Sequence, residues 1–276
     1  EADVLIIGCG PAGLTLATQL SKYSSVKTVI VDQKPGPLKL GQADGVACRT
    51  MEMFEAFSFS EKVLKEAYWV NETTFWKPSH QNEQEIVRSS RIQDTEDGLS
   101  EFPHVILNQA RVHDHLLEKM YNAPFRIQPN YKLKLIDLKV DDGPNIRVNE
   151  SYPVMATFQE IDSQKQKKTH IVRSQFVVGC DGARSSVRDF LKIKLKGDSA
   201  NQIWGVMDVL AISDFPDIRF KSVVHSSQEG NLLIIPREGG YLVRLYIELD
   251  KLKEDERLSS KDIKIETLIT SAKRIL

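Results

Sequence analysis

The apolar positions at the start of the chain predict a strand, a helix and a second strand. Residues 4–7 read Val-Leu-Ile-Ile, a continuous apolar run in which three of the four side chains are β-branched. Such a run is typical of a parallel strand that is buried on both faces. A glycine-rich turn follows, the apolar run over residues 14–20 fits a helix, and residues 27–31 have the pattern of another strand. This succession indicates a βαβ unit, and hence an α/β fold.

The rest of the chain alternates between helical and strand-like patterns. Helical spacing predicts helices over residues 49–57, 61–67, 109–120, 183–191 and 261–275. Short β-branched and aromatic runs predict strands over residues 68–70, 73–76, 85–88, 91–92, 104–107, 203–212, 218–225, 232–235 and 241–249, with antiparallel strands between 131 and 178. The two prolines and three glycines of residues 33–45 exclude regular structure, and a loop of this length indicates function or disorder.

The turn after the first strand has the spacing Gly-x-Gly-x-x-Gly. Gly8 permits a tight turn, Gly10 lets the backbone approach a pyrophosphate, and Gly13 lets the helix pack closely on the strand. Pro11 and Ala12 complete the loop, and Pro11 suits the first helical turn because its missing N–H is not needed there. The N–H groups and the positive dipole end of the helix then favour an anion.

An acid at the end of the second strand sharpens this interpretation. Asp32 follows Gly13 by 19 positions, close to the spacing of roughly 20 at which an acid accepts a hydrogen bond from a ribose 2′-OH. An acid here repels a 2′-phosphate, so the expected dinucleotide is FAD or NAD. The alternative is an ordinary βαβ unit with a glycine-rich turn, and the agreement of strands, glycines, helix and acid weighs against it.

Composition narrows the class of protein. A net charge of −1 over 276 residues gives no support to a nucleic-acid or anionic-membrane partner. No apolar run approaches the roughly 18 residues that span a bilayer, and no secretory leader is visible. The three cysteines are widely spaced, so we expect buried packing residues in a reducing, cytoplasmic setting rather than disulfides or zinc ligands. His113 and His115 lie two apart on a predicted helix and cannot share a face, and no metal is expected.

Three motifs together resemble those of the FAD-dependent aromatic hydroxylases (class A flavin monooxygenases), and most closely the fungal phenol 2-monooxygenases. They are Gly-Cys-Gly-Pro-Ala-Gly at residues 8–13, Gly-Gln-Ala-Asp-Gly at 41–45 with Cys-Arg-Thr at 48–50, and Gly-Cys-Asp-Gly-Ala-Arg-Ser at 179–185. The resemblance continues over residues 67–76, 102–113, 203–208 and 235–238. The glycine-rich loop alone is weak evidence, whereas the combination is highly specific.

This resemblance implies a FAD/NAD(P)-binding, Rossmann-like three-layer α/β fold with an inserted antiparallel-sheet substrate domain, like that of p-hydroxybenzoate hydroxylase. The FAD-binding domain is expected over residues 1–67 and 101–197, and the substrate domain over 68–100 and 198–276. The implied enzyme, a homodimer when full length, uses NADPH to reduce FAD, forms a peroxyflavin with molecular oxygen and hydroxylates a small phenolic substrate. Two alternatives stay open: another FAD-dependent oxidoreductase of the same fold, and an FAD-binding fragment without turnover.

The family motifs imply cofactor contacts at matching positions. These positions are Gly8, Gly10, Pro11, Ala12, Gly13, Asp32, Gln33, Gln42, Ala43, Arg49, Gln109, Asp181 and Gly182. The guanidinium fork of Arg49 suits a diphosphate, and Asp181-Gly182 matches a motif that serves FAD and, in this family, NADPH. From the residues alone, Asp181 is expected to cap the helix that follows, and both roles can hold.

The resemblance also implies three active-site residues. Asp44 matches an aspartate able to accept the phenol proton, Tyr246 a tyrosine that hydrogen-bonds the phenol oxygen, and Arg237 an arginine beside the flavin. Without the resemblance, Asp44 is a turn former before a glycine and Tyr246 an ordinary strand residue. The loop between Arg237 and Tyr246 is one residue longer than the family pattern, which leaves Tyr241 as a competitor.

Two family features have no counterpart in the sequence. One is a second flavin motif, a Gly-Asp pair before a loop and helix, and the other is a C-terminal thioredoxin-like domain. The chain is therefore expected to be the N-terminal part of a longer enzyme.

Overall fold

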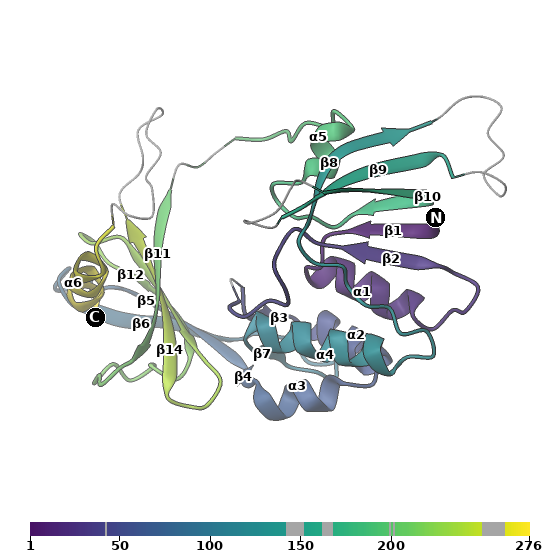
Figure 1. Ribbon diagram of the computed structural model, residues 1–276. Coiled ribbons are helices and arrows are strands. Elements are labelled where there is room, and N and C mark those ends of the chain that lie inside the picture. Colours follow the sequence, from purple (N-terminus) through teal and green to yellow (C-terminus); the bar gives the residue numbers. More distant parts are fainter. Residues whose placement is uncertain (42, 142–151, 162–167, 199, 201, 250–262) are drawn as a thin grey trace. The chain divides into compact units, whose positions relative to one another are not determined.

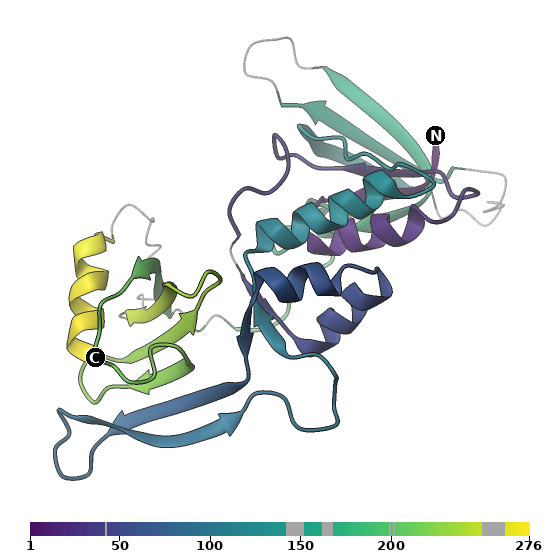
Figure 2. The same ribbon diagram turned by 90° about the horizontal axis from the view of Figure 1, so that it is seen from below.

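The computed structural model describes residues 1–41, 43–141, 152–161, 168–198, 200, 202–249 and 263–276 (Figures 1 and 2). The chain divides into two compact units, and each unit combines two separate stretches of sequence. The first contains Glu1–Gln42 and Gln109–Gly197, and the second contains Ala43–Asn108 and Asp198–Leu276. Within the described residues, no helix is both long and apolar enough to cross a membrane.

The first unit is built on a five-stranded sheet in the order β2-β1-β10-β9-β8. Its strands are β1 (Ala2–Ile7), β2 (Thr28–Val31), β8 (Leu133–Val140), β9 (Val154–Glu160) and β10 (Thr169–Gly179). β1 runs parallel to β2 and β10, whereas β8, β9 and β10 pair antiparallel. The N-terminal βαβ unit predicted from the apolar pattern is confirmed, with α1 (Pro11–Leu20) between β1 and β2.

Both faces of β1 are covered, which explains its continuous apolar run. On one face, Leu5 and Ile7 pack in a core with Val187 of the short helix α5 (Ser186–Phe190). Helix α1 contacts β1 and β2 and lies beside α4 (Gln109–Asn122), as both views show (Figures 1 and 2). Ile6, which alternates with Leu5 and Ile7 along the strand, is completely buried.

The second unit contains a six-stranded sheet in the order β11-β14-β13-β12-β5-β6. Its strands are β5 (Glu72–Pro78), β6 (Ile86–Gln93), β11 (Ile203–Leu210), β12 (Lys221–His225), β13 (Asn231–Pro236) and β14 (Leu242–Leu249). All neighbouring strands pair antiparallel except β12 and β5, which are parallel.

Helix α6 (Ile265–Ile275) covers one face of this sheet. Leu268 of α6 shares a core with Val243, Leu245 and Ile247 of β14. A Cβ atom on Gly205 of β11 would lie 2.1 Å from Leu268 Cδ2, so a larger residue at this point of the strand would require the Leu268 side chain to shift. The alternate residues of β11 and β14 face away from α6.

A smaller three-stranded sheet belongs to the second unit. It has the order β3-β7-β4, formed by β3 (Gly45–Val46), β4 (Tyr68–Val70) and β7 (His104–Ile106), with helices α2 (Cys48–Ala56) and α3 (Ser60–Glu66) between β3 and β4. Because β3 and β4 both pair with β7, residues 43–67 and 101–108 group with the second unit rather than the first. The assignment of a FAD-binding and a substrate-binding domain stays a prediction.

Several expected element boundaries differ from the structure. The strand expected over 218–225 begins at Lys221, because a turn in which the Phe220 N–H bonds the Asp217 carbonyl precedes it. The runs 85–88 and 91–92 form one strand, β6. The last helix begins at Ile265 rather than at residue 261, and residues 261 and 262 lie outside the described residues. The three cysteines are free, as expected, but only Cys9 is fully buried.

Candidate functional site

The three glycines of the N-terminal loop have different surroundings. Gly8 has φ +109°, and a Cβ on it would lie 2.3 Å from the Cys180 carbonyl oxygen; a Cβ on Gly13 would lie 1.9 Å from the Gly8 carbonyl oxygen. The packing of the protein itself therefore demands these two glycines. A Cβ on Gly10 would meet no protein atom within 4 Å, so nothing in the packing of the first unit demands a glycine there.

Gly10 borders two hollows of the first unit that share several lining residues. The smaller is lined by Cys9, Gly10, Pro11, Asp32, Lys34, Gly36, Leu38, Gln109, His113 and Tyr131. The larger is lined by Ile7, Gly8, Gly10, Asp32, Gln33, Lys34, Leu133, Leu135, Cys180, Asp181, Gly182, Arg184 and Ser186. The structure thus brings together eight of the residues that the sequence assigns to the cofactor: Gly8, Gly10, Pro11, Asp32, Gln33, Gln109, Asp181 and Gly182.

These residues fit the phosphate and ribose of a dinucleotide. Gly10 is the N-cap of α1, and neither a capping side chain nor an acid occupies the first turn of that helix. The N-terminal N–H groups of α1 are therefore suited to an anion. The Gly10 backbone is open to close approach, and the Asp32 carboxylate borders the same hollows. Ala12 is exposed in the first turn, and Gly13 is buried beneath it.

Side chains from two other elements hold the backbone of Cys9. The Cys9 N–H donates to Asp32 Oδ2 at 2.6 Å, and His113 Nε2 on α4 lies 2.5 Å from the Cys9 carbonyl oxygen. Since a carbonyl only accepts, Nε2 carries the proton. Burial lowers the pKa of His113, although its bond to Cys9 opposes this, so the imidazole is neutral at pH 7. Both polar backbone groups of the residue before Gly10 are fixed.

Asp181 has the capping role expected from its position. Its Oδ1 accepts the Ser185 hydroxyl at 2.5 Å, and its Oδ2 accepts the Val187 N–H at 3.1 Å. Ser185 in turn accepts the Arg188 N–H at 3.0 Å as the N-cap of α5. Gly182 has φ +81°, which a residue with a side chain rarely adopts.

Two other predicted cofactor residues, Ala43 and Arg49, belong to the second unit. Arg49 is on α2 of the second unit, where its Nη1 donates to Glu52 at 2.6 Å and its side chain is 90% exposed. Ala43 is exposed in the same unit, and Gln42 lies outside the described residues. Their roles stay predictions.

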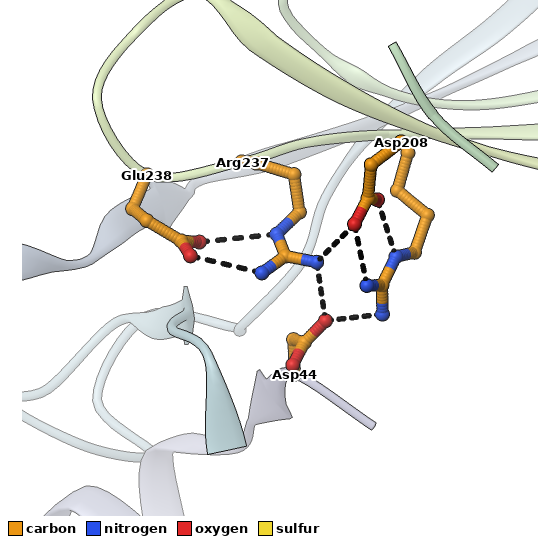
Figure 3. Close-up of polar contacts among 5 residues, drawn as sticks. Asp44, Asp208, Arg237 and Glu238 are labelled. Carbon is orange, nitrogen blue, oxygen red and sulfur yellow. Dashed lines mark hydrogen bonds and ion pairs between the residues drawn. The ribbon is translucent and has the colours of Figure 1, made fainter. Parts of the chain in front are cut away.

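The second unit contains a buried ionic cluster centred on Asp44 (Figure 3). The Asp44 residue is 5% exposed, and Arg237 is 1% exposed. Arg237 Nη1 donates to Asp44 Oδ2 at 2.5 Å, and Arg244 Nη1 donates to the same oxygen. The Asp44 carbonyl accepts the Leu107 N–H at 2.9 Å, which ties its backbone to the end of β7. Two predicted catalytic residues, Asp44 and Arg237, are therefore in direct contact.

Two further acids hold the outer edges of the arginines. Arg244 donates to Asp208 through Nε at 2.7 Å and Nη2 at 2.8 Å, and Arg237 donates to Glu238 through Nε at 3.0 Å and Nη2 at 2.9 Å (Figure 3). The hydrogen bonds from Arg244 hold the pKa of Asp208 below its usual value against burial. Hydrogen bonds to Asp208 and Tyr246, with the charge of Asp44, raise the pKa of Arg244 although burial opposes them.

Strand β14 contains Arg244 and one of the two candidate tyrosines, Tyr246. Tyr246 follows Arg244 by two residues on β14, so both side chains project from the face opposite α6. Tyr241 precedes the strand, and its side chain is 77% exposed. Tyr246 is therefore the tyrosine that adjoins the Asp44 cluster, although its catalytic role stays a prediction.

The sequence-based reasoning missed Arg244, Asp208, Glu238 and His113. Arg244 could have been found from the sequence, because polar and apolar residues alternate over residues 243–248. This alternation marks one polar face of a strand, and Arg244 lies on that face. Asp208 is an acid within an otherwise apolar strand. The contact of His113 with Cys9 leaves no local trace in the sequence.

Comparison with known proteins supports the resemblance seen in the motifs. The family described as "FAD binding domain" matches residues 1–275. A 3-hydroxybenzoate 4-monooxygenase from Comamonas testosteroni is 58% identical over 276 residues, which are 100% of this chain and 42% of that protein. A phenol 2-monooxygenase from Aspergillus fumigatus is 34% identical over 276 residues, or 100% of this chain and 44% of that protein. The chain thus spans less than half the length of these relatives.

Solved structures share the fold. The p-nitrophenol 4-monooxygenase of Pseudomonas putida superposes with a TM-score of 0.76 at 19% identity, covering 100% of this chain and 63% of that one. An aklavinone-11 hydroxylase in complex with FAD and aklavinone gives a TM-score of 0.75 at 20% identity, with 100% and 50% covered. The predicted α/β fold of the flavin-dependent aromatic hydroxylases is confirmed.

Proposed function

The chain belongs to the family of FAD binding domains, and on this premise we propose that it forms part of an FAD-dependent monooxygenase that hydroxylates a phenolic ring. In the complete reaction, one atom of molecular oxygen enters the ring as a hydroxyl group and the other leaves as water. NADPH supplies the hydride and a proton completes the balance. The relatives named above act on hydroxylated benzene rings by their names, and the bacterial one is the more similar, which supports a hydroxybenzoate or simple phenol as substrate.

The cofactor proposal rests on the open space beside Gly10, in a hollow that Asp32 and Gln109 also line. No protein atom lies where a Gly10 side chain would be, and these two polar residues line the same hollow. The N-terminus of α1 would hold the pyrophosphate, and Asp32 would accept the ribose 2′-OH. When bound, FAD supplies the redox and oxygen chemistry, and the protein supplies binding, orientation and proton handling. NADPH as reductant and a peroxyflavin as oxygen donor belong to the same proposal.

In the second unit, Asp44 would accept the proton of the substrate hydroxyl, and Tyr246 would hydrogen-bond the phenol oxygen. A phenolate is more electron-rich than a phenol, so removing this proton favours electrophilic oxygen transfer to the ring. Arg237 and Arg244 hold the Asp44 carboxylate in one position, which a group that must meet a small substrate requires. A homodimer and a cytoplasmic location remain parts of the proposal.

Two experiments test this function. The purified chain should bind FAD and show the yellow flavin spectrum; a colourless protein that FAD does not reconstitute would leave an FAD-binding role without support. The active protein should then form one hydroxylated product per NADPH oxidised when a hydroxybenzoate or phenol is added. NADPH oxidation that no phenol stimulates would instead favour another FAD-dependent oxidoreductase.

Asp44→Asn tests the proton acceptor. This variant keeps the size of the side chain and should slow hydroxylation at least about a hundredfold, the lower end of the typical contribution of a general base, with flavin reduction almost unchanged. Equal loss of both steps would contradict the role.

A further inference from the structure

The Asp44 cluster contains two similar arrangements that meet at one oxygen atom, and Asp208 Oδ2 also lies 3.5 Å from Arg237 Nη1 (Figure 3). In each, an outer acid accepts from Nε and Nη2 of an arginine, and the Nη1 of that arginine donates to Asp44 Oδ2. Asp208 holds Arg244, and Glu238 holds Arg237. Neither arginine relies on Asp44 alone for its orientation.

Because a guanidinium group is rigid, each outer acid determines the orientation of its arginine. The group is planar, so fixing Nε and Nη2 on a carboxylate also fixes where Nη1 points. Backbone pairing lies beside both outer acids. Asp208 lies on β11 directly opposite Arg244 in the antiparallel register, and Glu238 follows Arg237, whose N–H bonds the Leu242 carbonyl at 2.9 Å. Asp44 Oδ2 is therefore held by Arg244 of β14 and by Arg237, which directly follows β13.

We propose that Asp208 and Glu238 are positioning residues that fix the carboxylate of Asp44, acting through Arg244 and Arg237. Neither acid is expected to touch the substrate. The catalytic consequence rests on the proposed function: a displaced Asp44 would leave the substrate hydroxyl in place without its proton acceptor, so reduced flavin would be reoxidised without hydroxylating the ring.

The chain offers a matched control for a merely structural role. Asp217 accepts from Arg88 Nε at 2.7 Å and Nη2 at 2.5 Å, the same two-bond geometry in the same unit. Asp217 also accepts the Trp76 indole N–H at 2.8 Å. Asp217→Asn should therefore cost folding stability without changing Asp44.

A double-mutant cycle on the purified chain tests the positioning without any turnover. Urea unfolding is measured for Asp208→Asn, Asp44→Asn and the double variant, and again with Asp217→Asn in place of Asp208→Asn. The first cycle should depart from additivity by at least about twofold in the unfolding constant, as for contacting residues, while the second should be additive. Additivity in both cycles would overturn the proposal. The same cycle with Glu238→Gln tests the other arm.

A second measurement reads the consequence for the reaction. In the active protein, Asp208→Asn and Glu238→Gln should each lower the hydroxylated product formed per NADPH oxidised at least threefold, with FAD affinity and the rate of flavin reduction within twofold of the wild type. Asp208→Glu, which keeps the carboxylate, should recover part of the yield. A yield equal to that of Asp217→Asn would overturn the proposal. If the wild type forms no hydroxylated product, the proposed function fails, while the unfolding cycle still decides the positioning.

Discussion

The carboxylate of Asp32 accepts the backbone N–H of Cys9 at 2.6 Å, so the acid assigned to the ribose also holds the loop assigned to the pyrophosphate. Its other oxygen accepts the Lys34 N–H at 2.7 Å. One residue thus links the two halves of the expected nucleotide site.

Two replacements of Asp32 should therefore weaken FAD binding to different degrees. Asp32→Asn keeps an oxygen that can accept from Cys9 but loses the charge, whereas Asp32→Ala leaves the Cys9 N–H without its partner. We expect FAD to bind about tenfold more weakly to the first and up to about a hundredfold more weakly to the second, from the strength of charged hydrogen bonds. Flavin fluorescence quenching measures both. Asp3→Ala is the control, because Asp3 accepts the Lys27 N–H at 2.7 Å at the other end of β1. Equal affinity in all three variants would contradict the assignment.

Replacing Gly10 should affect FAD binding, whereas replacing Gly13 should affect folding stability. Gly10→Ala is compatible with φ −74° and ψ −179° and meets no protein atom, so the free energy of unfolding should change by less than about 1 kcal/mol while FAD affinity falls strongly. Gly13→Ala places a Cβ 1.9 Å from the Gly8 carbonyl oxygen and should destabilise the first unit. Thermal unfolding and FAD titration of both variants check this, and a stable Gly13→Ala protein would contradict it.

His113→Phe should loosen the glycine-rich loop, because it removes the donor to the Cys9 carbonyl at an almost fully buried position. The lost bond should cost about 1–3 kcal/mol of stability and weaken FAD binding severalfold. His115→Phe is the matched control: His115 is similarly buried on the same helix and is not among the residues that line the two hollows. The same loss of FAD affinity in both variants would show a general effect on α4 instead.

The free energy of unfolding of the wild type should fall at acidic pH because His113 becomes protonated. Burial lowers the pKa of His113 below its ordinary value of 6.5, so the unfolded chain binds a proton at a higher pH than the folded one. The stability contributed by neutral His113 is complete above pH 6.5 and is lost as the pH falls from there through the lower folded pKa. Urea unfolding over this range should show a steeper decline for wild type than for His113→Phe, and parallel curves would contradict the prediction.

Asp44→Ala should destabilise the second unit and is a poor probe of catalysis. It leaves two buried guanidinium groups facing each other, and removing one partner from a buried ion pair costs about 3–5 kcal/mol. Asp44→Asn retains an oxygen acceptor and should cost clearly less. Urea unfolding compares them, and equal stabilities would show that the arginines do not depend on the Asp44 charge.

The sequence predicts the first unit well because its signals are local. The apolar run of β1, the glycine spacing and Asp32 lie within 32 residues, and the structure places them as predicted. The capping role of Asp181 is equally local, since its partners Ser185 and Val187 follow within six residues.

The Asp44 cluster could not be assembled from the sequence because its members are distant. Asp44 meets Arg237 and Arg244 only after β13 and β14 have paired, and Asp208 meets Arg244 only through the register of β11 with β14. The resemblance supplied Asp44 and Arg237 as separate residues; the contact between them is a property of the sheet. The pairing of β3 with β7 has the same origin, because two-residue β3 is too short to show a pattern and is defined by its partner β7.

The close fit of Gly8 against Cys180 orders events during synthesis. Strand β1 can pair with β2 soon after both leave the ribosome. Its other edge pairs with β10, which is made only after the whole first stretch of the second unit. Until then the nascent N-terminal loop lacks the surface against which Gly8 turns. Cofactor capture is therefore a late step, and ribosome-bound chains that end before residue 180 should not retain FAD.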